Sequence, residues 1–138
     1  MEKNLKKVVF DTNILISAFV FPEGTVRELI NLSIKRKISI YVSNSIILEY
    51  CKVLDSKFNW TEEEIKENIK FISKITEIID TDIKIDIIKE DEDDNKIIEC
   101  AVAADVDAII SGDKHLLNIK KYKNIPILKP ADFLKKIL

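Results

Sequence analysis

The sequence is poor in the residue types on which several common active sites depend. Its 138 residues include 2 glycines, 2 cysteines and 1 histidine. So few glycines cannot form a phosphate-binding loop, and a single histidine excludes a ribonuclease that needs two histidines for acid–base catalysis. One histidine and two distant cysteines also do not make a zinc site. Any catalysis must therefore depend on other side chains.

Long apolar runs and a strong positive charge are also missing. No run approaches the roughly 20 apolar residues that cross a bilayer, and Asp11 interrupts the stretch after the basic N-terminus, so we expect neither a membrane segment nor a secretory signal. Cys51 and Cys100 fit small buried residues in a reducing cytoplasm, where we expect the protein to act. The formal net charge is −2. Nucleic acid would therefore have to be held by local basic patches.

Strand-like and helix-like patterns alternate along the chain, whose length fits one compact domain over residues 1–138. Strands are predicted at 7–10, 38–42, 77–79, 107–110 and 125–128, and 83–88 is either an edge strand or an extended crossing. Helices are predicted from residue 11 or 12, from Thr25 as an N-cap, after the cap cluster 43–45, at the capping box 61–64, after the acidic run 90–94, around 116–117, and over 130–137. The alternation indicates a three-layer α/β/α fold with a mainly parallel sheet.

Four acidic residues fall on the rim where such sheets bind ligands, beyond the carboxyl ends of the strands. Asp11 and Asp113 each follow a predicted strand, and either could simply be a helix N-cap. Asp94 begins a helix on the same rim, where a solvated charge that stabilises the helix terminus would explain it. Glu49 lies among apolar residues about one turn into a helix, where an unpaired carboxylate is costly. A salt bridge to Lys52 competes with a site role for Glu49.

The combination of these acids is more informative than any one of them. Four carboxylates on one rim repel each other and would raise each other's pKa unless a cation neutralises them. A hard divalent ion does so through oxygen ligands, and Mg²⁺ needs only one or two direct carboxylates because it keeps several waters. Such a site activates water and neutralises charge on a phosphodiester. We therefore expect a divalent metal at this rim.

Three segments resemble the successive motifs of PIN-domain nucleases. They are VVFDTNILISAFVFPEGTVRELI at 8–30, SNSIILEY at 43–50 and EDEDDNKIIECAVAADVDAIISGDKHLL at 90–117. The similarity covers nearly the whole chain in the family's order, and it is greatest to the VapC-like toxin components of toxin–antitoxin pairs. The resemblance implies a five-stranded parallel sheet between helices, with four acids around Mg²⁺ or Mn²⁺ at one end.

Carried over by motif, the catalytic and metal-binding residues are Asp11, Glu49, Asp94 and Asp113. Asp11 and Asp94 are expected to be direct ligands, whereas Glu49 and Asp113 are expected to act through water. Asn13 and Ser111 match polar positions that orient these acids. Asp91 or Asp93 could share the work of Asp94, but helical spacing favours Asp94 because the apolar residues that follow it then fall on the buried side.

The resemblance implies hydrolysis of single-stranded RNA by an endoribonuclease whose product carries a 5′-phosphate. Lys114, Lys52 and the cluster 35–37 are candidate phosphate contacts, although each is also an ordinary surface cation. Trp60 and Phe58 could stack on a base, and packing explains them more readily.

The expected partners are RNA, a small antitoxin protein and a second copy of the chain. Two other functions stay open. One is a PIN-fold module that binds RNA or protein with little or no catalysis, and the other is an RNA-processing nuclease without an antitoxin.

Overall fold

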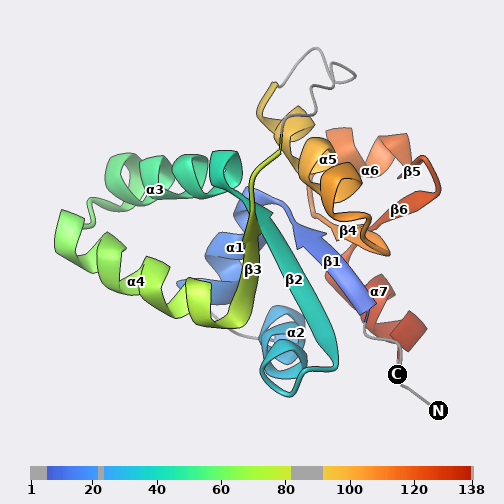
Figure 1. Cartoon of the computed structure of the whole chain (residues 1–138), viewed down its shortest axis with the longest axis horizontal. Coiled ribbons are helices and arrows are strands. Elements are labelled where there is room, and N and C mark those ends of the chain that lie inside the picture. Colours follow the sequence, from blue (N-terminus) through green and yellow to red (C-terminus); the bar gives the residue numbers. More distant parts are fainter. Residues whose placement is uncertain (1–5, 22–23, 82–91, 138) are drawn as a thin grey trace.

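A mainly parallel sheet forms the centre of the fold (Figure 1). The computed structural model describes residues 6–21, 24–81 and 92–137. The strands are β1 (Lys6–Phe10), β2 (Ile38–Ser43), β3 (Thr76–Ile79), β4 (Ala108–Ile110), β5 (Lys121–Tyr122) and β6 (Ile125–Leu128). They lie in the order β3-β2-β1-β4-β6-β5, in which only the β5–β6 pair is antiparallel. The expected five parallel strands are therefore confirmed, with a two-residue edge strand in addition.

Helices cover both faces of this sheet and complete the predicted three layers. They are α1 (Thr12–Phe19), α2 (Gly24–Ile34), α3 (Asn44–Phe58), α4 (Glu62–Ile75), α5 (Glu92–Ala104), α6 (Lys114–Ile119) and α7 (Pro130–Ile137). Helix α5 packs across β1, β2 and β4, and α1 and α2 lie on the other face. Helices α3 and α4 form an antiparallel hairpin beside the β2–β3 edge (Figure 1). In the three described ranges, no helix is long and apolar enough to cross a membrane.

Local sequence signals explain where most helices begin. Ser43 and Thr61 cap α3 and α4 through their hydroxyl groups, and Thr61 forms the predicted capping box with Glu64. The predicted N-cap at Thr25 is wrong, because α2 already begins at Gly24. Gly24 itself has a φ of 59°, a left-handed value outside the helical range, which glycine adopts at no steric cost. The predicted segment 83–88 lies outside the described residues.

The central strands end side by side, which positions the site. The last three residues of β1, 8–10, are all buried. Because both faces of the strand are covered there, its sequence is a continuous apolar run and not an alternating pattern. Directly after it, the backbone N–H of Asp11 donates to the carbonyl of Ile110 at the end of β4, at 3.1 Å. The N–H of Ser111 donates in turn to Leu128 of β6, at 2.9 Å. Asp11 and Ser111 are therefore neighbours at the carboxyl edge of the sheet.

The capping box of α4 allows a direct test of this account of the fold. Replacing Thr61 by alanine removes the acceptor for the Glu64 N–H, and we expect the free energy of unfolding in urea to fall by about 1 kcal/mol. The control is Ser73→Ala in the same helix, whose hydroxyl only donates back to the Lys70 carbonyl and which should change stability by less than about 0.5 kcal/mol. Equal effects of the two substitutions would contradict the capping account.

Candidate active site

The Asp11 carboxylate is held at both of its oxygens. It is the N-cap of α1, and its Oδ1 accepts a 2.8 Å hydrogen bond from the Ile14 backbone N–H. Its Oδ2 accepts a hydrogen bond from the hydroxyl of Ser111. Only 4% of the residue is exposed to solvent. A buried negative charge is thus fixed in one orientation at the end of β1.

Ser111 connects Asp11 to Asp113. Its fully buried hydroxyl donates to Asp11 and accepts a 2.9 Å hydrogen bond from the backbone N–H of Asp113. Asp113 is the N-cap of α6, and its Oδ1 accepts a 3.1 Å bond from the His115 N–H. The Ser111 hydroxyl therefore contacts both the Asp11 carboxylate and the Asp113 backbone, and its orienting role stays a prediction.

Asp94 reaches the same place from the beginning of α5. It is buried, with 8% of its surface exposed, and it forms a hydrogen bond with Asp113 that is the main cause of the lowered pKa of Asp113. Two carboxyl groups can share a hydrogen bond only if one of them holds a proton. The Oδ2 atom of Asp94 is buried and accepts no hydrogen bond in the described part of the chain, while the carboxyl group as a whole is engaged with Asp113.

Glu49 comes from the second turn of α3 and is half-buried. Its Oε1 accepts a 2.7 Å hydrogen bond from the hydroxyl of Thr12, in the first turn of α1. This bond joins the α3–α4 hairpin to the edge of the sheet. The apolar residues beside Glu49 in the sequence do not surround its carboxylate, because Leu48 is 66% exposed on another face of the helix.

These acids line one cleft with a volume of about 190 Å³. The polar side chains around it are those of Asp11, Thr12, Asn13, Glu49, Lys57, Asp94 and Asp113. All four acids predicted from the sequence, and the supporting Asn13, are thus brought together. The alternatives to Asp94, namely Asp91 and the side chain of Asp93, lie outside what the structure describes.

Burial of the acids makes this cleft electrostatically unfavourable without a cation. Burial raises the pKa of Asp11, and the nearby charge of Asp113 raises it further, while hydrogen bonds from Ser111 and the backbone act in the opposite direction. Lys57 lines the cleft but forms no salt bridge within the described residues. An acidic cluster of this kind is stabilised by a bound cation.

The chemistry of the donor set fits Mg²⁺ or Mn²⁺. The available donors are carboxylate, hydroxyl and amide oxygens, which hard divalent ions prefer. Across 6–21, 24–81 and 92–137, no three acidic, histidine or cysteine side chains are close enough to enclose an ion by themselves. Mg²⁺ usually keeps several waters and takes one or two carboxylates. The cleft therefore suits a hydrated ion better than one that is fully enclosed by protein.

Sequence reasoning missed Lys57 and Thr12. Glu49, Val53 and Lys57 are spaced four residues apart and share the face of α3 that lines the cleft. This spacing from Glu49 could have predicted that Lys57 lies at the cleft. Thr12 carried no signal beyond its place next to Asp11.

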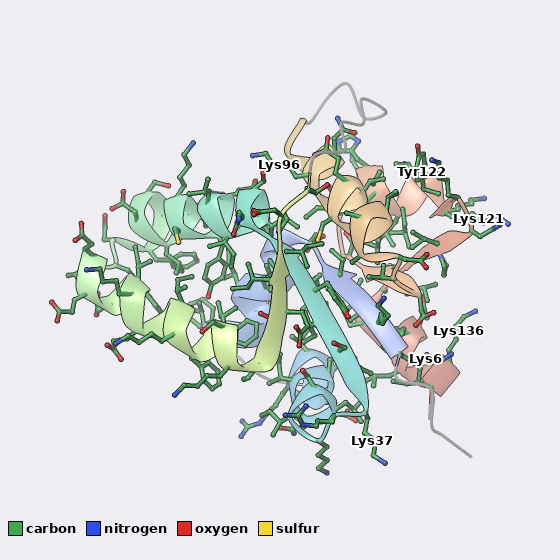
Figure 2. All side chains as sticks on the ribbon, in the orientation of Figure 1. Lys6, Lys37, Lys96, Lys121, Tyr122 and Lys136 are labelled. Carbon is green, nitrogen blue, oxygen red and sulfur yellow. The ribbon has the colours of Figure 1, made fainter. Side chains whose placement is uncertain are left out.

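The predicted phosphate contacts do not line the cleft. Exposed Lys114 begins α6, where its charge helps to lower the pKa of Asp113. Lys52 lines a different groove, described below. The cluster 35–37 precedes β2 and so lies at the amino end of the sheet. Figure 2 shows Lys37 there, at the end opposite Lys96 in α5.

The fold and the cleft together define an α/β protein with a carboxylate cluster at the carboxyl edge of a parallel sheet. The family model of the PIN domain matches residues 7–115, and the chain belongs to this family. PIN domains are generally nucleases that use divalent metals. The chain is also 36% identical over 141 aligned positions to the uncharacterized protein MJ1680 of Methanocaldococcus jannaschii, and the match covers 95% of this chain and 90% of that protein.

Solved structures of other proteins share the fold, and two of them illustrate this. One is VapBC2 from Rickettsia felis bound to a DNA fragment from its promoter, with a TM-score of 0.64 and 18% identity over 88% of this chain and 96% of that one. The other is PAE2754 from Pyrobaculum aerophilum, with a TM-score of 0.54 and 11% identity over 96% of this chain and 89% of that one. At these identities, the similarity concerns the fold.

The raised pKa of Asp11 predicts how stability depends on pH. Its folded-state pKa lies above the ordinary value, so this group favours the fold at low pH, and its contribution is lost as the pH rises through the folded-state pKa. In EDTA at pH 8, Asp11→Asn should therefore melt a few degrees above the wild type, and the difference should shrink as the pH falls toward 4.

The control for this melting experiment is the exposed Asp55 of α3, whose change to asparagine should have little effect at either pH. Mg²⁺ or Mn²⁺ should raise the melting temperature of the wild type by mass action and leave that of Asp11→Asn nearly unchanged. An equal rise in both proteins would place the metal elsewhere.

Proposed function

We propose that this protein is a metal-dependent endoribonuclease that hydrolyses phosphodiester bonds of single-stranded RNA. The observation that supports this most strongly is the convergence of acids from four separate parts of the chain on one cleft. Such a concentration of buried carboxyl groups is unfavourable for the fold alone, so a role in binding a cation explains it best. Membership of the PIN domain family supports a nuclease.

The two most buried acids are proposed as the direct metal ligands. Asp11 and Asp94 are 4% and 8% exposed, whereas Glu49 and Asp113 are half-buried and would hold the ion through water. Thr12 and Ser111 orient Glu49 and Asp11 by hydrogen bonds, so the acids are arranged before the ion binds. When bound, the metal would neutralise charge on the phosphodiester and increase the acidity of the water that attacks it.

Lys57 and Asn13 are proposed to hold the RNA phosphate at the cleft. Lys57 lies on the cleft face of α3, and Asn13 is exposed at the beginning of α1. In the proposed reaction, the oxygen of water forms a bond to phosphorus, and the bond from phosphorus to the 3′-oxygen breaks. The products are then a 3′-hydroxyl end and a 5′-phosphate end.

We further propose that the protein is a toxin controlled by an antitoxin and acts as a homodimer in the cytoplasm. The support for an antitoxin is the similarity in fold to VapBC2 of Rickettsia felis. The exposed apolar side chains of Phe21, Phe58 and Phe71 provide surface for protein contacts. A nuclease of RNA processing that has no antitoxin would contain the same cleft, and purification with or without a bound partner distinguishes the two.

Cleavage of labelled single-stranded RNA tests the proposed chemistry. With Mg²⁺ or Mn²⁺ we expect cleavage products with 5′-phosphate ends, and EDTA should abolish them. Asp94→Asn removes a direct ligand while keeping the size of the side chain, so its activity should fall at least about 100-fold. If the wild type leaves varied RNAs intact with either metal, the protein is a binding module and not an enzyme.

The role of Lys57 is tested by the salt dependence of RNA binding. Measured with Ca²⁺ in place of Mg²⁺, Lys57→Gln should weaken binding for all sequences and reduce the slope of log K against log salt by about 1. The matched control is Lys70→Gln on α4, since Lys70 is exposed, pairs with Glu67 and is absent from the cleft lining. An unchanged slope for Lys57→Gln would exclude it as a phosphate contact.

A further inference from the structure

A second and larger hollow adjoins the acidic cleft. It has a volume of about 610 Å³ and lies along α3, with the first turn of α4 and Lys96 of α5 completing its wall. Glu49 lines both the cleft and this hollow, which we call the α3 groove. A chain that passes over Glu49 therefore leaves the cleft and enters the α3 groove directly.

The length of the α3 groove suits a short piece of extended polymer. It is lined by α3 residues from Ser45 to Asp55, a span of about 15 Å at the helical rise of 1.5 Å per residue. At about 3.4 Å per nucleotide of a stacked strand, this length corresponds to roughly four nucleotides, and an extended strand would place fewer there.

Cationic side chains from three elements line the α3 groove. They are Lys52 from α3, Lys66 from α4 and Lys96 from α5. Three acids, Glu49, Asp55 and Glu62, line the same groove, so its lining as a whole has no net formal charge. Because Glu49 also lines the proposed metal site, a bound ion would leave Asp55 and Glu62 as the acids that oppose the three lysines.

Trp60 provides a flat and rigid apolar surface in the α3 groove. It lies between two helix caps, because Asn59 ends α3 with a φ of 54° and Thr61 begins the capping box of α4. The Trp60 backbone N–H donates to the Leu54 carbonyl at 3.1 Å, which closes the end of α3. The half-buried ring packs against the core and also lines the groove. A fixed, partly exposed indole can stack on any base.

We infer that the α3 groove binds the part of a single-stranded RNA that continues beyond the bond to be cut, with one base stacked on Trp60. The phosphates of this segment lie near Lys52, Lys66 and Lys96. This inference rests on the proposed ribonuclease function and extends it from the reaction centre to the path of the substrate. Lysines on three elements around an aromatic surface match the alternation of phosphate and base, and the apolar side chains of Leu48 and Ile65 in the same lining can contact base faces.

Trp60 is the only tryptophan in the chain, so tryptophan fluorescence reports on its surroundings, which are the α3 groove and a more acidic hollow along α4 that contains Glu63, Glu64 and Glu67. The experiment uses the full-length Asp94→Asn protein with Ca²⁺ and a single-stranded RNA of about 12 nucleotides. We expect saturable quenching, and Lys66→Gln should raise the Kd about 3-fold to 10-fold, whereas Lys70→Gln leaves it unchanged. Trp60→Leu, with binding followed by a label on the RNA, should raise the Kd about 10-fold. An RNA without bases should bind and cause little quenching.

Cys51 gives a second measurement that needs no substitution of Trp60. Cys51 is half-buried and lines the α3 groove, whereas Cys100 is fully buried and has its pKa raised by burial to about 12. Burial raises the pKa of Cys51 too, so the selectivity comes from access: a maleimide should label Cys51 and leave the fully buried Cys100 unmodified in the folded protein. Bound RNA should slow the labelling of Cys51 at least about 5-fold, and addition of the same RNA to Lys66→Gln should protect it less.

The outcomes separate this inference from the proposed function. If the wild type cleaves RNA while binding neither quenches Trp60 nor protects Cys51, the α3 groove is not the RNA path and the ribonuclease proposal stands. If quenching and protection occur but no RNA is cleaved with Mg²⁺ or Mn²⁺, the groove binds RNA and the proposed catalysis is wrong. Protection of Cys51 by a basic amphipathic helical peptide, but not by RNA, would overturn the inference in favour of a protein-docking surface.

Discussion

The burial of a negative charge at Asp11 is the constraint on which the arrangement of the site depends. Asp11 follows β1 directly and has only 4% of its surface exposed, and burial raises its pKa despite the hydrogen bonds that favour its ionised form. Asp11 lies where the two central strands end, and among the described residues no cationic side chain forms a salt bridge with it. A bound divalent ion would relieve the cost of burying this charge, so ion affinity and the stability of the fold are expected to be linked.

The polar contacts of the site also hold distant parts of the chain together. The Thr12–Glu49 hydrogen bond joins α1 to α3, and the Asp94–Asp113 hydrogen bond joins α5 to the beginning of α6. Ser111 connects the ends of β1 and β4 from a fully buried position. A change in charge at the cleft therefore acts on several elements at once. Each of the four acids takes part in one of these hydrogen bonds, and none of them is an isolated surface charge.

The features that could be predicted from the sequence are those set by local rules. Apolar runs identified the strands, and hydroxyl caps such as Ser43 and Thr61 identified helix starts. The two-residue strand β5 could not be predicted, because it exists only through its pairing with β6. The position of Lys57 at the cleft depends on which face of α3 meets the sheet, which only its spacing from Glu49 could have indicated. The cluster 35–37 could have been excluded, because the rule that selects residues after a strand places those before β2 at the opposite edge.

Two of the acids, Asp11 and Asp113, are also helix N-caps, which limits how the activity could be lost in evolution. Asparagine caps a helix as well as aspartate does, and a single transition in the codon converts one into the other. Glutamate carries an additional methylene, which would move its carboxylate away from the backbone N–H groups that it must reach. At Asp11, where burial raises the pKa, stability therefore offers no resistance to asparagine, whereas at Asp113 the lowered pKa shows that the charge itself is favoured in the folded state. Where lineages retain aspartate at position 11, purifying selection is acting on the chemistry of the cleft.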